Sequence, residues 1–480
     1  MLSGQRFDGH ANEFRRTRGH FFLRMQAENG GISRLRFFNV EGLSVADPEL
    51  LHDVFVERGR AFEKSLALKM AFYPLAGKGL FTSEGDLWKR QRKLMAPLFS
   101  PAAVRGYADT MNAVISRYLD TWRDGEVIDA GREMTRITMA VVGKILFDSD
   151  TFDDADELGA AIQVMFHHLT DQGGSLALIL RATAGVQLLE LGQLPPWADK
   201  LRSDTIDWLS RPLPFPTAGR RRLFSAVATL DRKMKEMIDE RRRSGGDRND
   251  LLTRLLRARD EDDGKVMTDR QVRDEAITLF VAGHETTATS TTWALHFLSR
   301  NPEVYRRWKE EVAGLEGRAP SADDAARLVY TTGIFKEALR LYPPAFILDR
   351  VPQEDVKVGD YHVPRHTVIF VCPYSMHRRP ELWPDPERFD PGRFTPENEA
   401  KRHRLAWLPF GAGPRVCIGA SFAAQEAQIL LAQIAQRFEL EAVDQDPVGV
   451  SFLTALHPDR PVRLRVKRVT PGASAAAMAS

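Results

Sequence analysis

The stretch VMTDRQVRDEAITLFVAGHETTATSTTWALHFLSRNP predicts one uninterrupted helix of about 30 residues. Thr268 suits the N-cap, and Gln271 at the third helical position completes a capping box. Pro302 marks the far end of the helix. At 1.5 Å per residue the helix is about 45 Å long, which is enough to cross a whole domain. The rest of the chain must therefore pack around it.

The remaining pattern is mostly helical. The segment ISRLRFF and the β-branched runs after Tyr342 predict a smaller amount of strand. We therefore expect a mainly α fold with a minor β region, built as one domain over residues 1–470. Residues 471–480, within the stretch TPGASAAAMAS, are expected to form a disordered tail.

Charge and cysteine content limit the possible partners and compartments. The formal net charge of the 480 residues is only +2, so no global basic field predicts binding to nucleic acid. Two cysteines cannot build a disulfide framework, which is typical of a reducing compartment. The N-terminal segment lacks the apolar core of a signal peptide, and no apolar run is long enough for a transmembrane anchor. These features predict a cytoplasmic protein.

The centre of the long helix has an unusual composition, AGHETT. Gly283 costs up to about 1 kcal/mol relative to alanine in a helix, and the threonines that follow are weak helix formers. A glycine here would let a bulky planar ligand approach the backbone, while Glu285 and Thr286 would supply an acid and a hydroxyl. The alternative is a buried helix with a packing face rich in serine and threonine.

The second distinctive segment is FGAGPRVCIG, residues 410–419. Gly411 and Gly413 permit a tight turn whose backbone N–H groups can point at the sulfur of Cys417. A thiolate stabilised in this way is a metal ligand. The alternative for Cys417 is a small buried apolar residue, which is the role that we expect for Cys372 in TVIFVCPY.

A third pattern places Glu337 and Arg340 on one face of a helix that must end before Pro343. Together with AGHETT, PERF (which contains Arg388) and FGAGPRVCIG, this order resembles the cytochrome P450 superfamily of haem-thiolate monooxygenases. The resemblance extends from about Trp88 to Leu464. It implies the cytochrome P450 fold, a single triangular haem-binding domain with a long central helix.

The resemblance also implies a cofactor, haem b, whose iron is bound by the thiolate of Cys417. The expected propionate partners are Trp88, Arg92, Arg350 and Arg415, and Gln91 stands where many members of the family carry histidine. Phe410, Gly411 and Gly419 around the cysteine, and Gly283 in the helix, are expected to contact the haem. Glu337, Arg340 and Arg388 match a structural triad that serves folding and haem retention.

By the same resemblance Thr286 and Glu285 are the catalytic pair, and O2 is the oxidant. The residues expected to line an apolar substrate pocket are Phe280, Ala282, Ala345, Phe346 and Ile347. Such a pocket would accept an apolar small molecule such as a fatty acid, terpenoid or steroid.

Only 63 residues follow Cys417, too few for a flavin reductase module. We therefore expect electrons from NAD(P)H to arrive through a separate ferredoxin or flavodoxin with its reductase, docking on the basic cluster Lys89, Arg90, Arg92 and Lys93. Three alternatives stay open. They are a haem-binding sensor without turnover, a helical scaffold without haem, and a family member that rearranges an oxygenated substrate without external electrons.

Overall fold

The computed structural model describes residues 8–38, 40–149, 155–172, 175–189, 195, 197–198, 201, 205, 208–211, 218–245, 250–258, 264 and 266–469. The predicted tail, residues 471–480, lies outside these residues. Within the described part, none of the helices combines the length and the apolar character that a membrane span requires.

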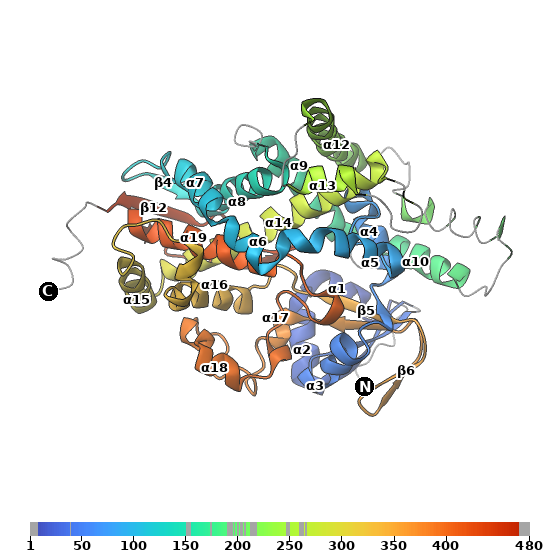
Figure 1. Cartoon of the computed structure of the whole chain (residues 1–480). Helices are drawn as coiled ribbons and strands as arrows, with labels where there is room; N and C mark the ends of the chain where they lie inside the picture. Colours follow the sequence, from blue (N-terminus) through green and yellow to red (C-terminus); the bar gives the residue numbers. More distant parts are fainter. Residues whose placement is uncertain are drawn as a thin grey trace.

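The long helix is confirmed as α14 (Asp269–Leu298), with the capping box between Thr268 and Gln271 formed as predicted. Most of its side chains are buried, because other helices pack around it. The largest contacts are with α8 (Ala130–Phe147) and α16 (Val329–Leu341). Figure 1 shows α14 running through the middle of the helical part. This burial explains why the helix tolerates weak helix formers: tertiary packing supplies the stability.

Further helices surround α14, and the list gives their bounds. They are α1 (Ala11–Thr17), α2 (Gly19–Asn29), α3 (Pro48–His52), α4 (Leu66–Ala76), α5 (Gly85–Met95), α6 (Pro101–Gly106), α7 (Ala108–Leu119), α9 (Ala155–Gln172), α10 (Leu176–Leu189), α12 (Ala218–Ser244), α13 (Leu251–Arg257), α15 (Pro302–Ala313), α17 (Pro373–Met376), α18 (Pro396–Lys401) and α19 (Ala420–Arg437). Short helical turns are η1 (Asp53–Glu57), η2 (Ala96–Phe99), η3 (Ala322–Ala326), η4 (Pro391–Phe394), η5 (Arg404–Ala406) and η6 (Gly413–Arg415).

The minor β region is also confirmed. Its main sheet has the order β1-β2-β8-β5-β3, in which β2 and β8 are parallel and the other pairs antiparallel. The segment ISRLRFF forms β1, and the runs after Tyr342 form β5 to β8. The strands are β1 (Ile32–Phe37), β2 (Val40–Val45), β3 (Phe62–Glu63), β4 (Val127–Asp129), β5 (Leu348–Pro352), β6 (Val356–Val358), β7 (Tyr361–Val363), β8 (Val368–Val371), β9 (Phe438–Ala442), β10 (Val450–Phe452), β11 (Leu456–Pro458) and β12 (Arg463–Arg468).

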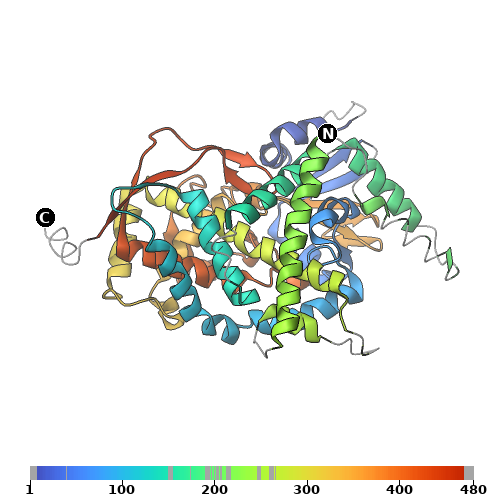
Figure 2. The ribbon, with the colours of Figure 1, turned by 90° about the horizontal axis from the view of Figure 1, so that it is seen from above.

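The arrangement places the sheet and the helical bundle at different ends of the molecule. In Figure 1 the main sheet and α1 to α3 lie beside the N-terminus, whereas α7, α15, α19 and β12 lie toward the C-terminus. Figure 2 shows the same molecule from above, with α12 crossing over the bundle. The largest apolar core lies among α7, α8, α14, α16 and α19. Cys372, directly after β8, is buried in a smaller apolar cluster, as predicted.

Candidate active site

The cysteine segment forms a tight turn against η1. Gly411 and Gly413 both have φ of +67°, a conformation that favours glycine. A Cβ on Gly413 would lie 1.6 Å from the carbonyl oxygen of Phe55, so no side chain fits there. The N–H of Cys417 donates to the carbonyl oxygen of Phe410 at 2.9 Å. The backbone thus holds the thiol in a fixed position at the start of α19.

Cys417 lies deep in the protein, yet its side chain is accessible to solvent. Burial raises the pKa of its thiol, while the backbone N–H of Gly419 and the charge of Arg92 oppose this rise. Arg92 itself donates to the carbonyl oxygen of Val416 at 2.7 Å. A Cβ on Gly419 would meet only the Cys417 Sγ at 3.9 Å and a Phe99 ring atom at 4.0 Å. Protein atoms therefore do not crowd the space beside the sulfur.

Helix α5 joins this turn through Trp88 and Arg415. The Arg415 guanidinium lies 3.7 Å from the centre of the Trp88 ring, donates to the carbonyl oxygen of Ser83 at 3.2 Å and pairs with Glu84. Burial lowers the pKa of Arg415 to about 10. Arg415 is thus held by stacking and by fixed hydrogen bonds.

Two further cations lie near Arg415. Arg350, on β5, is buried and donates to the carbonyl oxygen of Asp349 at 2.6 Å. Lys64, between β3 and α4, lies 3.7 Å from Glu84. Its pKa is well below the usual range, first because of burial and then because of the charges of Arg415 and Arg350. The sequence analysis missed Lys64, because no motif marks it.

Gln91, which stands where many family members have histidine, is buried in a network of its own. Its side-chain oxygen accepts a hydrogen bond from the Ser83 hydroxyl at 2.6 Å, and its nitrogen donates to the carbonyl oxygen of Lys78 at 3.1 Å. The side chain thus fixes the segment that leads into α5.

The hydroxyls in the centre of α14 bond back to the helix. Thr286 Oγ1 donates to the carbonyl oxygen of Ala282 at 2.8 Å. In the same way, the hydroxyls of Thr287 and Thr291 each donate to the carbonyl oxygen four residues earlier, that of Gly283 and of Thr287. Ala282 and Thr286 are accessible, whereas Thr287 and Thr291 are buried. Since residues four apart share a face, one face of the helix borders open space and another packs in the core.

Gly283 has a packing role besides the expected contact with a planar ligand, which stays a prediction. A Cβ at this position would lie 3.1 Å from a methyl group of Val142 on α8. The hydroxyl of Thr138, also on α8, donates to the carbonyl oxygen of His284 at 3.0 Å. The missing side chain of Gly283 therefore permits the close approach of two helices.

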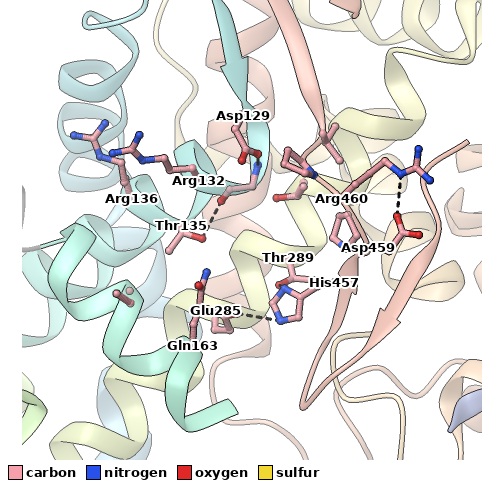
Figure 3. Close-up of a pocket in the computed structure, with 17 residues that line it drawn as sticks. Asp129, Arg132, Thr135, Arg136, Gln163, Glu285, Thr289, His457, Asp459 and Arg460 are labelled. Atoms are coloured by element: carbon pink, nitrogen blue, oxygen red, sulfur yellow. Dashed lines mark hydrogen bonds and ion pairs between the residues drawn. The ribbon is translucent and has the colours of Figure 1, made fainter. Parts of the chain in front are cut away.

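Glu285 is buried beside two imidazoles. Its Oε1 lies 3.1 Å from His457 Nε2, and its Oε2 lies 3.7 Å from His284 Nε2. Burial raises the pKa of Glu285 to about 7 and lowers the pKa of each histidine to about 4. Figure 3 shows Glu285 and His457 pointing toward one another from α14 and β11. The sequence analysis missed His457, which is far from Glu285 in the chain.

The expected triad needs a correction. Arg340 donates to Glu337 through Nε at 2.6 Å and Nη2 at 2.7 Å, as predicted, but the second arginine is Arg393, with Nε 3.4 Å from Glu337 Oε1. The Arg388 side chain is exposed, and only its carbonyl oxygen takes part, accepting from Arg340 at 3.2 Å. The segment PERFDPGRF contains the pattern Pro-x-Arg-Phe twice, and the structure uses the second copy.

Two of the predicted pocket residues are core residues instead. Phe280 is buried against the rings of Phe147 and His284, and Phe346 is buried against Phe452. These aromatic side chains pack within the protein because their neighbours on α8 and β10 cover them. The remaining three predicted residues are at least partly accessible: Ala282, Ala345 and Ile347.

Comparison with known proteins identifies the family. The sequence matches the Cytochrome P450 family over residues 7–183 and 197–465. The chain belongs to the cytochrome P450 family. Relatives include cyclooctatin synthase of Streptomyces melanosporofaciens, 34% identical over 88% of this chain and 85% of its own, and pentalenene oxygenase of Streptomyces avermitilis, 32% identical over 97% and 96%. The solved structure of the cytochrome P450DA heme domain has a TM-score of 0.79 and 26% identity, covering 97% of this chain and 96% of its own.

The protein is thus a cytochrome P450 oxidoreductase with haem b as its cofactor. The residues present fit this group. Cys417 offers an accessible thiol, and beside it a Cβ on Gly419 would meet only the sulfur and a Phe99 ring atom, at ordinary contact distances. Lys64, Arg350 and Arg415 lie close together, and the charges of the two arginines lower the pKa of Lys64, so a carboxylate such as a haem propionate would relieve their repulsion. Family membership rules out the helical scaffold without haem.

Proposed function

We propose that this cytochrome P450 inserts one oxygen atom from O2 into a cyclic terpenoid, using electrons from a separate redox partner. Three relatives carry names of terpenoid metabolism: cyclooctatin synthase, cyclooctat-9-en-7-ol 5-monooxygenase and pentalenene oxygenase. The match with this chain covers at least 85% of the length of each. The observation that carries the proposal is the nature of the accessible residues. The three accessible residues of the predicted pocket, Ala282, Ala345 and Ile347, are all apolar, which suits an apolar substrate.

Haem bound through the thiolate of Cys417 supplies the activation of O2. We assign Thr286 and Glu285 to proton delivery. The hydroxyl proton of Thr286 is already used by the carbonyl oxygen of Ala282, so its lone pairs can accept a hydrogen bond from a water or ligand at the open face of α14. Glu285, with a pKa of about 7, can both release and take up a proton at neutral pH.

The proposed docking surface for a ferredoxin or flavodoxin is the exposed face of α5. Lys89 and Lys93 lie four residues apart and are both exposed, whereas Arg92 points inward to Val416. An acidic partner would gain long-range attraction from these lysines. Turnover should therefore fall as the salt concentration rises, and more weakly in a Lys93→Gln variant.

The test of the function combines binding and product analysis. Limonene and β-caryophyllene should produce the spin-state change of the haem, and a surrogate ferredoxin system with 18O2 should place one labelled atom in the product. Lauric acid and progesterone are the comparison ligands. Oxidation of lauric acid alone would overturn the terpenoid assignment, and conversion without any reductase would favour the isomerase alternative.

The roles of Thr286 and Glu285 are tested with the same system. Thr286→Ala should retain haem and substrate binding but divert electrons from product to hydrogen peroxide. Glu285→Gln should slow turnover, because the amide cannot carry the proton. The proposed roles fail if both variants couple NAD(P)H consumption to product as well as the unmodified protein does.

A further inference from the structure

A polar pocket of about 680 Å³ lies on the side of α14 that Glu285 faces. It is bounded by α8, α9 and the segment that follows β11 (Figure 3). Arg132, Gln163, Asp459 and Arg460 on its walls are exposed, so the pocket opens to solvent. Glu285, Thr289 and His457 lie on its inner wall. The pocket therefore connects bulk solvent with the acid of the catalytic pair.

His457 occupies the position between solvent and Glu285. Its side chain is 24% exposed, whereas that of Glu285 is 8% exposed. Its Nε2 lies 3.1 Å from Glu285 Oε1, and its Nδ1 lies 3.5 Å from the Thr289 hydroxyl. An imidazole with one nitrogen on an acid, the other beside a hydroxyl, and a ring that is partly exposed in a solvent-open pocket has the geometry of a proton relay.

We propose that His457 carries protons from the surface pocket to the Glu285 carboxylate. This inference rests on the proposed function, in which Glu285 supplies protons for the reaction. Neutral His457 carries its proton on Nε2, and Nδ1 takes a second proton from solvent to give the imidazolium. Nε2 then passes its proton to Glu285 Oε1, which leaves the Nδ1–H form. Exchange of the ring proton with solvent restores the Nε2–H form before the next transfer. One proton enters from solvent, and one proton ends on Glu285.

The order of the pKa values gives the transfer its direction. The pKa of Glu285 is about 7 and that of His457 about 4, both shifted by burial, so a proton shared by the pair resides on Glu285. When Glu285 is a carboxylate, its negative charge at 3.1 Å favours the imidazolium and helps His457 to accept the next proton. The relay thus works only after Glu285 has delivered its proton.

Several other charged groups face this pair from the surrounding elements. On α14, the Nδ1 of His284 lies 2.8 Å from the carbonyl oxygen of Phe280 and carries the proton in this arrangement, which leaves Nε2 as an acceptor toward Glu285. Its pKa of about 4 keeps it neutral. The other titratable or charged groups are His167 on α9, Asp129 at the end of β4, Arg132 and Arg136 on α8, and Asp459 and Arg460 after β11. Of these, His167 further lowers the pKa of His457.

The test follows the protonation of Glu285 directly in the haem-loaded protein. The infrared band of the protonated carboxyl is identified by its loss in Glu285→Gln, and its growth is timed after a jump from above to below neutral pH. His457→Gln keeps a polar side chain of similar reach but cannot carry the proton, so protonation should be roughly tenfold slower or more. His362→Gln, at an exposed histidine of β7, is the matched control and should leave the rate unchanged.

If Glu285 is protonated as fast in His457→Gln as in the unmodified protein, the relay is overturned, and His457 only positions the Glu285 side chain. Equal slowing in His362→Gln would overturn it as well. If His457→Gln does not fold, as judged by its carbon monoxide difference spectrum, His457→Phe provides the same comparison. Because this measurement needs no substrate or electron donor, its outcome is independent of the terpenoid assignment. Failure of the proposed function would instead appear as unchanged coupling in Thr286→Ala.

Discussion

The pairing of Glu337 with Arg393 instead of Arg388 predicts a large difference between two neighbouring variants. The Arg393 Nε lies 3.4 Å from a carboxylate that is fully buried, and the Arg393 side chain is 12% exposed. At an effective dielectric constant of about 20 this attraction is roughly 5 kcal/mol. Loss of guanidinium solvation offsets part of it. We therefore expect Arg393→Ala to destabilise the fold by about 2 kcal/mol, a factor of roughly 30 in the unfolding equilibrium.

Arg388→Ala should change stability by less than about 0.5 kcal/mol, because the side chain is exposed and the variant keeps the carbonyl oxygen that accepts from Arg340. Urea unfolding at 25 °C, followed by tryptophan fluorescence, compares the two variants. Glu337→Gln is the reference for the largest expected loss of stability. It leaves the buried Arg340 without its counter-charge, which should lower the free energy of unfolding by about 3 to 5 kcal/mol. An Arg388→Ala midpoint shifted as far as that of Arg393→Ala would refute the assignment.

Three further predictions concern the haem region and Glu285. Gly413→Ala should prevent folding, as measured by circular dichroism, because φ is +67° and the Cβ would overlap a carbonyl oxygen. Gly419→Ala should fold but bind haem more weakly, as measured by haem titration. Lys64→Gln should speed haem transfer to apomyoglobin by roughly tenfold, because a buried cation is lost. With a pKa of about 7, raised by burial, Glu285 binds its proton more tightly when folded, so stability falls as pH rises from about 4.5 to 7. Glu285→Gln should remove this loss, worth about 3 kcal/mol in urea unfolding at about pH 8.

Local signals in the sequence predicted the elements that have strong caps or periodicity. The helix α14 was predicted with its capping box, because Thr268, Gln271 and Pro302 lie at distances that only the local backbone determines. The end of α16 before Pro343 is of the same kind. The second arginine of the triad could not be predicted in this way. Arg388 and Arg393 occur in equivalent local patterns, and only the packing of η4 against α16 decides which one reaches Glu337.

The residues that the sequence analysis missed share a physical cause. Lys64 contributes to the cation group only because β3 pairs with β5, which carries Arg350. His457 meets Glu285 only because β11 lies against α14. A lysine or histidine without a surrounding motif gives no sign of such long-range contacts. Cys417 and its glycines were identified because the turn they form is local.

Of the two interpretations of the α14 centre, the packing face is confirmed, whereas the catalytic role of Glu285 and Thr286 stays a prediction. Thr287 and Thr291 form the buried packing face, while Thr286 is accessible. Successive residues of a helix are rotated by about 100°, so Glu285 and Thr286 cannot face the same space. Glu285 faces the surface pocket and His457, and Thr286 faces the open side beside Ala282. In the proposed function, α14 therefore separates the surface pocket from the space beside Thr286, and Glu285 is the member of the pair that takes up protons from the pocket.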